Sequence, residues 1–141
     1  MHPVYLLDTN ILSDSAKPMP NMSVLRKIQE NQERCAICAT VWQEFVRGYK
    51  RMPEGRKKRY IEDFLIDIKN TYVILPYDDF AAQICGELQA RCENAGTPAP
   101  RYGSQIAATA IANGMILVTH NTEDYAALCQ NSMLKIEDWW E

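Results

Sequence analysis

Near the start of the chain stands Val4-Tyr5-Leu6-Leu7-Asp8-Thr9-Asn10-Ile11-Leu12, the stretch from which the fold can be inferred. Four mainly apolar residues end at Asp8, and apolar residues return at Ile11 and Leu12. A short apolar run that ends in a polar cap, with a second apolar pair behind it, is typical of a buried strand that leads into a helix. We therefore predict a strand over residues 4–7 and a helix after it.

The same alternation of apolar strand and helical spacing continues to the end of the chain, without an internal repeat or a linker. Strands separated by helices pair in parallel and are covered on both faces. We predict an α/β fold with a mostly parallel central sheet flanked by helices. The expected strands are residues 35–38, 72–75, 115–119 and 133–136, and the expected helices are residues 21–30, 41–46 with Thr40 as cap, 53–68, 78 or 79 to 88, 104–113 and 122–128.

Composition places the chain among ordinary globular proteins. Its 141 residues are 47% apolar and 23% charged, which fits one domain over residues 1–141 with a sizeable core. The longest apolar runs are too short to cross a bilayer. The first seven residues lack the basic start and the cleavage site of a signal peptide. We therefore expect a cytoplasmic protein with no membrane segment.

The five cysteines are an odd number in a chain without an export signal, which argues against a disulfide framework. Cys35 and Cys38 have the C-x-x-C spacing, but the sequence offers no second pair to complete a tetrahedral zinc site. Thiols half-buried on a strand are the favoured interpretation, and a redox motif is the alternative.

Charge is unevenly distributed along the chain. The net charge is −3, yet residues 47–59 carry seven basic residues against one acidic residue, a net +6, so the remainder carries −9. A basic patch on an acidic body is compatible with local contacts to phosphates. A solvated helical face is the alternative interpretation.

Three polar clusters are expected at one edge of the sheet, because parallel α/β sheets bind ligands beyond the carboxyl ends of their strands. They are Asp8-Thr9-Asn10, Glu44, and Thr119-His120-Asn121. Helical spacing places Glu44 near an apolar stripe, where a carboxylate needs a partner, a proton or a metal. Each cluster also has a structural alternative: Asp8 as a helix cap, Glu44 in solvent, and Asn121 as the cap of a helix with Asp124 in its first turn.

Four blocks of residues carry a more specific signal. They are Leu6-Leu7-Asp8-Thr9-Asn10, Val41-Trp42-Gln43-Glu44-Phe45, Ile106-Ala107-Ala108-Thr109-Ala110 and Leu117-Val118-Thr119-His120-Asn121-Thr122-Glu123-Asp124-Tyr125. In this order they resemble the PIN-domain family, and more closely its VapC toxins, the ribonuclease halves of bacterial toxin–antitoxin pairs. The ending Ile136-Glu137-Asp138-Trp139 is similar too, so the resemblance covers essentially the whole chain.

The resemblance implies a three-layer PIN-like domain that cleaves RNA with Mg²⁺ or Mn²⁺. Acidic residues hold the metal, which activates water and neutralises charge on the phosphate. By position, Asp8 would be the first metal ligand, Glu44 the second acid and Asn121 a further catalytic residue. The supporting residues would be Thr9, Asn10, Thr119 and Asp124, and the RNA-binding residues Arg47, Lys50 and Arg51.

The resemblance also implies partners. These are a VapB-like antitoxin, a second copy of the chain in a homodimer, and a structured RNA, with tRNA the foremost candidate. Aromatic residues that look exposed would supply the protein surfaces, and core packing is the alternative for them. They are Trp42, Phe45, Tyr49, Phe64, Trp139 and Trp140.

One position departs from the family pattern. Relatives usually have Asp three residues before the first residue of the Ile-Ala-Ala block, where this chain has Gly103. We expect this substitution to weaken metal binding and RNA cleavage. Either the nuclease is naturally weakened, or the lost Asp made a toxic enzyme tolerable to a host. Glycine could instead be required there as a turn residue with positive φ.

Two other functions are compatible with parts of the sequence. A non-catalytic module that binds RNA or an antitoxin is the main alternative, because Gly103 removes a carboxylate. A phosphotransferase of the haloacid-dehalogenase type would explain an apolar strand ending in Asp8. That family needs a second Asp two residues later, where this chain has Asn10.

Overall fold

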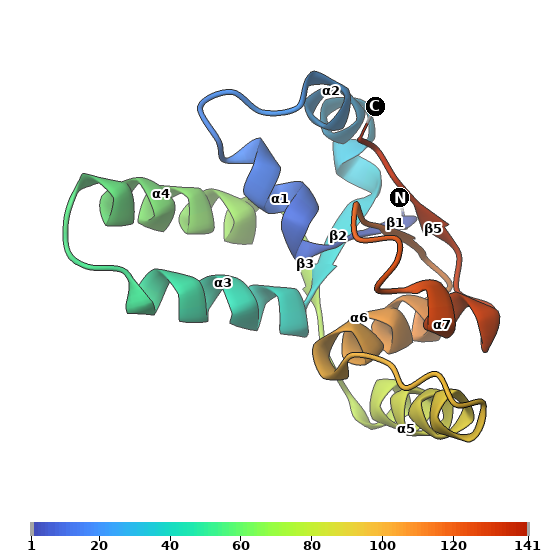
Figure 1. Cartoon of the computed structure of the whole chain (residues 1–141). Coiled ribbons are helices and arrows are strands. Elements are labelled where there is room, and N and C mark those ends of the chain that lie inside the picture. The colour runs from blue at the N-terminus through green and yellow to red at the C-terminus, as the bar shows by residue number, and fades with distance from the viewer. Residues whose placement is uncertain (1, 141) are drawn as a thin grey trace.

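The central element is a five-stranded, all-parallel sheet in the order β3-β2-β1-β4-β5 (Figure 1). The computed structural model describes residues 2–140, so the two ends of the expected domain, Met1 and Glu141, lie outside the described residues. The strands are β1 (Tyr5–Leu7), β2 (Cys35–Cys38), β3 (Val73–Leu75), β4 (Ile116–Val118) and β5 (Ile136–Glu137). The predicted parallel sheet is thereby confirmed.

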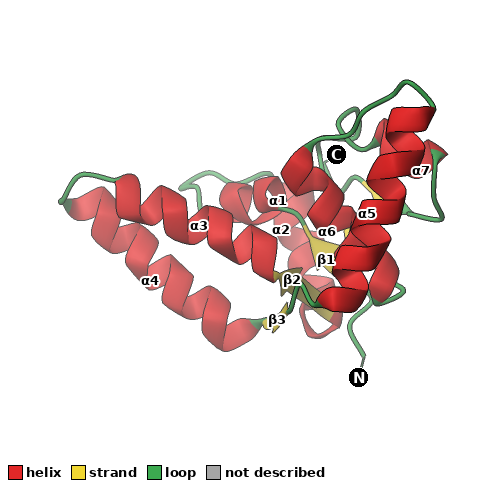
Figure 2. Cartoon of the chain, turned by 90° about the horizontal axis from the view of Figure 1, so that it is seen from below, coloured by secondary structure: helices red, strands yellow, loops and turns green. Residues whose placement is uncertain are grey.

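Helices cover both faces of this sheet. One pair packs on one side and another pair on the other, while two long helices form a hairpin that projects beyond the β3 edge (Figures 1 and 2). The first pair is α1 (Thr9–Ser15) and α2 (Met22–Asn31), the second is α5 (Asp79–Asn94) and α6 (Arg101–Ala112), and the hairpin is α3 (Ala39–Arg51) and α4 (Arg56–Thr71). A short 3₁₀ helix, Gln32–Arg34, precedes β2, and α7 (Ala126–Gln130) precedes β5.

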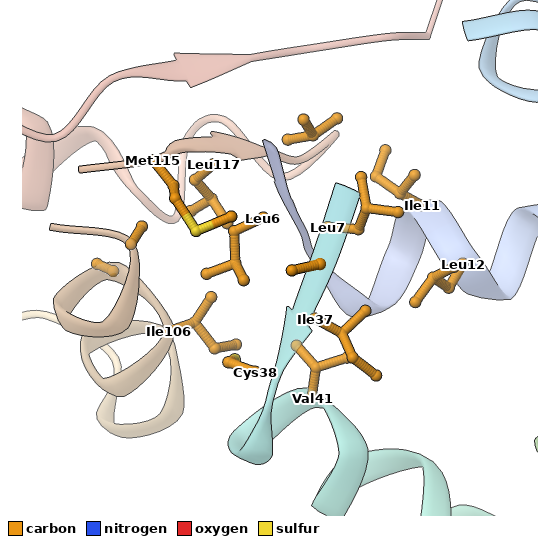
Figure 3. Close-up of a cluster of buried hydrophobic side chains, with 14 of the residues drawn as sticks. Leu6, Leu7, Ile11, Leu12, Ile37, Cys38, Val41, Ile106, Met115 and Leu117 are labelled. Atoms are coloured by element: carbon orange, nitrogen blue, oxygen red, sulfur yellow. The ribbon is translucent and has the colours of Figure 1, made fainter. Parts of the chain in front are cut away.

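The core lies on both sides of β1, because successive side chains of a strand point to opposite faces. Leu6 faces Ile106 and Leu117 on the α6 side, and Leu7 faces Ile11 and the α1 side (Figure 3). Leu6 and Leu7 are both 0% exposed. Burial on both faces explains why the strand is a continuous apolar run rather than an alternating one.

Several predicted element boundaries were wrong, and each error has a local cause. Helix α3 begins at Ala39 after Cys38, so Thr40 lies inside it. Helix α4 begins at Arg56 rather than at Pro53, because Gly55 first turns the chain with φ of 153°. Helix α6 begins at Arg101, three residues earlier than predicted, with Pro100 as its N-cap.

At the C-terminal end, a turn replaces the beginning of the helix predicted from residue 122. The Asp124 amide bonds to the Asn121 carbonyl at 3.1 Å, and α7 begins only at Ala126. Neither Asn121 nor Asp124 therefore acts as a helix cap or lies in the first helical turn. Strand β5 comprises Ile136–Glu137, later than the predicted residues 133–136, because the chain is still in a turn at Ser132.

Other sequence expectations can be compared directly with the structure. Trp139 is buried against Tyr5, with ring centroids 5.1 Å apart, so its predicted exposure was wrong. The other five aromatic residues expected at the surface are half-buried against the core. All five cysteines are free, and Cys35 and Cys38 are buried on β2. Among the described residues, no helix combines the length and apolarity needed to cross a bilayer.

Candidate active site

The strand order changes direction between β1 and β4, and this is where an open parallel sheet forms a crevice at its carboxyl edge. The Asp8 amide donates to the Val118 carbonyl at 3.0 Å, which fixes the end of β1 against the end of β4. A cavity of about 150 Å³ opens there. It is lined by Asp8, Thr9, Asn10, Glu44, Pro100, Tyr102, Gly103, Ile106, Asn121, Asp124 and Tyr125. The predicted convergence of Asp8, Glu44, Gly103 and Asn121 is thereby confirmed.

Asp8 is the most firmly held side chain of the cavity, with only 5% of its surface exposed. Its Oδ1 accepts a hydrogen bond from the Thr9 amide at 2.8 Å, which caps α1. Its Oδ2 accepts from Thr119 Oγ1 at 2.9 Å, Tyr125 Oη at 3.1 Å and Asn10 Nδ2 at 3.3 Å. The helix-cap interpretation of Asp8 is thus confirmed, and its role in catalysis stays a prediction.

A second layer of hydrogen bonds connects the ends of β1 and β4. Asn10 Oδ1 accepts from the His120 amide at 3.0 Å, and Asn10 Nδ2 lies 3.3 Å from Thr119 Oγ1. Thr119 Oγ1 also accepts from the Asn121 amide at 3.0 Å. Asn10 and Thr119 therefore hold the loop that presents Asn121, which is itself exposed at the cavity mouth. Thr119 lies behind the lining and acts through Asp8.

Glu44 reaches the cavity from α3. It follows the buried residues Thr40 and Val41 by four and three positions, so it lies on the same side of the helix and is half-buried. Thr9 Oγ1 is buried next to it, with no hydrogen-bond partner of normal geometry among the described residues. Glu44 is thus less firmly held than Asp8.

The two carboxyl groups share an unfavourable electrostatic environment. Burial raises the pKa of Asp8 above its usual 3.8, although hydrogen bonds from Thr119, Thr9, Tyr125 and Asn10 work against the rise. Burial and the nearby charge of Asp8 raise the pKa of Glu44 above its usual 4.5, while Thr9 and Arg47 work against that rise. A pair of carboxylates that disfavour each other's charge is a place where a cation is stabilised.

Gly103 lies in the first turn of α6 and lines the same cavity as this pair. Positive φ occurs among the described residues only at Gly55, Gly96 and Gly114, so Gly103 is not a turn residue that requires glycine. A Cβ atom at Gly103 would lie 3.5 Å from Pro100 Cβ and 3.6 Å from Tyr125 Cε1, which are ordinary van der Waals distances. The backbone can therefore accept Asp at this position.

The three residues predicted to bind RNA lie on one side of α3, because Lys50 and Arg51 follow Arg47 by three and four positions. Arg47 borders a small hollow of about 40 Å³ next to the main cavity, together with Thr40, Gln43, Glu44 and Tyr102. Lys50 and Arg51 occupy the last turn of α3, farther along the projecting hairpin. Lys50 Nζ lies 5.5 Å from the centroid of the Tyr49 ring, away from the lining of the cavity.

Two aromatic residues of the site were not predicted. Tyr125 is 4% exposed and donates to Asp8, and burial raises its pKa well above the usual range. Tyr125 stands in the same sequence block as Asn121, and this position was the signal that could have identified it as a site residue. An aromatic residue in such a block is more often part of the hydrophobic core. Tyr102 lines both hollows, and its position one residue before Gly103 was the only hint.

The donor set can be compared with what Mg²⁺ or Mn²⁺ needs. Within residues 2–140, no three His, Cys, Asp or Glu side chains are grouped closely enough to hold a metal ion. Asp8 and Glu44 remain, and Mg²⁺ is often bound by one or two carboxylates with water completing its shell. The two residues fit such a minimal site. A carboxylate can accept about four hydrogen bonds, and Asp8 already accepts four, so a metal ion would replace one of these donors.

Comparisons with known proteins agree with this geometry. The PIN domain family model matches residues 5–129. The tRNA(fMet)-specific endonuclease VapC of Shigella flexneri is 32% identical over 96% of this chain and 97% of its own. The crystal structure of FitAcB from Neisseria gonorrhoeae superposes with a TM-score of 0.88 and 25% identity, over 98% of this chain and 99% of that one. A DNA-bound VapBC from Salmonella typhimurium gives a TM-score of 0.79 and 25% identity, over 97% and 98%. The chain therefore belongs to the PIN-domain family and, within it, to the VapC group.

Proposed function

We propose that the chain is a metal-dependent endoribonuclease toxin whose cleavage is weakened by glycine at position 103. The observation that carries this proposal is that Asp8 and Glu44 line one cavity, and that Gly103 belongs to the same lining. The relative from Shigella flexneri is named as specific for tRNA(fMet). We extend this to a tRNA substrate for the present chain, and therefore to a location in the cytoplasm.

The side chains of the cavity have separable roles in this proposal. When bound, Mg²⁺ or Mn²⁺ supplies activation of water and neutralisation of charge on the phosphate. Asp8 and Glu44 provide the oxygen ligands, and Asn121 is placed at the mouth to orient the phosphate. Thr119, Asn10 and Thr9 hold the carboxylates in position, because a ligand must be fixed within a fraction of an ångström to be effective.

An antitoxin partner is supported by a groove between α1 and the α3–α4 hairpin. Two adjoining hollows of about 350 and 560 Å³ share Ser13, Ala16, Lys57 and Ile61. The smaller hollow reaches Glu44. A groove of this kind suits an amphipathic segment of another chain. We propose that a VapB-like antitoxin lies here and blocks the active site, and that the toxin itself is a homodimer.

The direct test is RNA cleavage by the chain and by Gly103→Asp. In Mn²⁺, Gly103→Asp should cleave initiator tRNA at least about 100-fold faster, equivalent to about 3 kcal/mol of transition-state stabilisation. EDTA should abolish this increase in the cleavage rate. Gly103→Asn is the matched control, since it adds similar bulk without the charge. A Gly103→Asp protein that keeps its melting temperature but cleaves no tRNA would contradict the proposal.

A second candidate is a non-catalytic module that binds an antitoxin or RNA, favoured by the lack of a three-acid cluster among residues 2–140. It predicts that neither form of residue 103 cleaves RNA. It also predicts that a VapB-type protein binds both forms equally well in isothermal titration calorimetry. Size-exclusion chromatography with light scattering would test the homodimer in the same samples, and a monomer at micromolar concentration would contradict it.

A further inference from the structure

Tyr102 is the only aromatic residue that borders both hollows at the carboxyl edge of the sheet among the described residues. It lies in the first turn of α6, one residue before Gly103, and 41% of its surface is exposed. Burial does not explain its presence, because a phenol ring that remains in solvent contributes little to the core. Tyr102 instead forms part of the wall of the cavity that Asp8 and Glu44 also line.

Two arginines give this wall a positive character. Arg101 Cζ lies 5.8 Å from the centroid of the Tyr102 ring. Arg47 is one turn after Glu44 on α3 and shares the small hollow with Tyr102 and Glu44. The charge of Arg47 works against the rise that burial and Asp8 cause in the pKa of Glu44. The acidic cavity therefore has a cationic border on this one side.

The size of the hollows restricts what can bind there. The small hollow of about 40 Å³ is too small to enclose a nucleobase, so it can accept only part of a ligand, such as the oxygens of a phosphate. Arg101 lies over one face of the Tyr102 ring, and 41% of the surface of Tyr102 remains exposed. Unpaired bases are recognised by stacking on aromatic rings, and arginine binds the phosphates that join them. An exposed ring with Arg101 over one face, and with Arg47 in the same small hollow, offers both kinds of contact.

We propose that Tyr102 and Arg47 form a nucleotide subsite beside Glu44, in which an unpaired RNA base stacks on Tyr102 and its phosphate contacts Arg47. The subsite rests on the proposed function, since it places the nucleotide next to the phosphodiester that faces Asp8 and Glu44. It also gives a physical role to Arg47 that differs from the roles of Lys50 and Arg51, which lie farther along the hairpin. The preferred substrate is then a loop or a single-stranded region rather than a duplex.

The test is binding of a fluorescein-labelled single-stranded RNA of about ten nucleotides, measured by anisotropy in EDTA and again in Mg²⁺. Tyr102→Ala should weaken binding about tenfold, the usual effect of losing one stacked base. Tyr102→Phe keeps the stacking face and should stay within about twofold of the native chain. Phe80→Ala is the matched control, because Phe80 is 57% exposed on α5 and outside both hollows. Phe80→Ala should leave the affinity for the RNA unchanged.

Arg47→Gln tests the phosphate contact separately. It should weaken RNA binding. It should also make the slope of log K against log salt concentration shallower by about 0.7, the value for one phosphate contact on a single strand. Lys50→Gln should have a smaller effect. Melting temperatures of all variants should match the native chain, because the substituted side chains are exposed or half-exposed.

The outcomes separate this subsite from the proposed function. If neither the native chain nor Gly103→Asp binds or cleaves RNA, both ideas are wrong. If RNA is bound or cleaved but Tyr102→Ala behaves like Phe80→Ala, only the subsite is wrong. Equal losses for Tyr102→Phe and Tyr102→Ala would also overturn it, because they would assign the effect to the hydroxyl rather than to stacking.

Discussion

The two halves of the cavity are built in different ways. Asp8 is 5% exposed, follows the central strand and accepts four hydrogen bonds. Opposite it, Glu44 projects from a helix and is half-buried, and Gly103 has no side chain. The first half is determined by the meeting of two strand ends, so a substitution that removes its hydrogen bonds disturbs the fold. The second half depends on single side chains on helices, so a substitution can remove a ligand and leave the fold intact.

Asp8→Asn should produce the largest effect on cleavage. In the Gly103→Asp background we expect a loss of more than about 100-fold, because one charged oxygen ligand disappears. Folding should survive, since Asn is as good a helix cap as Asp and the Thr119 and Tyr125 hydroxyls can rotate to accept from its amide. Cleavage assays and thermal melts on the same preparation provide the measurement. Retained cleavage would remove Asp8 from the active site.

Tyr125→Phe should lower stability without removing a ligand. A hydrogen bond to a charged group contributes about 1.5–3 kcal/mol, so urea unfolding should show a loss in that range. A double-mutant cycle with Asp8→Asn isolates the charged part of this contact, because Tyr125→Phe should cost less stability when a neutral Asn stands at position 8. Thr119→Val provides a comparison, because it removes another hydrogen bond to the same oxygen, Asp8 Oδ2. A fully additive cycle would mean that the charge of Asp8 does not strengthen the Tyr125–Asp8 bond.

The contrast between the two halves also explains what could be predicted from the sequence. Strands β1 to β4 and the Asp8 position were predictable, because an apolar run with a polar cap is a local pattern. The starts of α4, α6 and α7 were not, since they are set by Gly55, by Pro100 and by the turn after Asn121. The Tyr125–Asp8 bond joins residues 117 positions apart, and no local pattern encodes it.

The contribution of Asp8 and Glu44 to stability in EDTA should decrease as pH rises from about 4 towards neutrality. Burial raises the pKa of Asp8 above 3.8, and burial with the charge of Asp8 raises that of Glu44 above 4.5. The folded chain therefore binds these protons more tightly than the unfolded chain does. Their contribution to stability is complete below the unfolded pKa values and is lost as pH rises through the folded ones.

The variants Asp8→Asn and Glu44→Gln isolate this effect. Neither can titrate at the substituted position, so the stability of each relative to the native protein should improve as pH rises. Urea midpoints measured across the range provide the comparison, with Asp79→Asn on exposed α5 as a control that should follow the native profile. Parallel profiles for all four proteins would mean that the buried carboxyls do not titrate abnormally.

The smallest expected effect concerns Gly103 itself, and it tests whether the second half of the cavity can change freely. Gly103→Ala should stabilise the chain by about 0.5 kcal/mol, because alanine loses less backbone freedom in a helix than glycine does. The added Cβ meets its neighbours at 3.5–3.7 Å, which requires no displacement. Gly114, just beyond the other end of α6, has φ of 63°, so Gly114→Ala should instead destabilise by about 1 kcal/mol. Chemical denaturation of the two variants separates a tolerated glycine from a required one. If Gly103→Ala destabilised as much as Gly114→Ala, position 103 would need glycine for structural reasons, and its missing carboxylate would be a consequence of the fold rather than a loss of function.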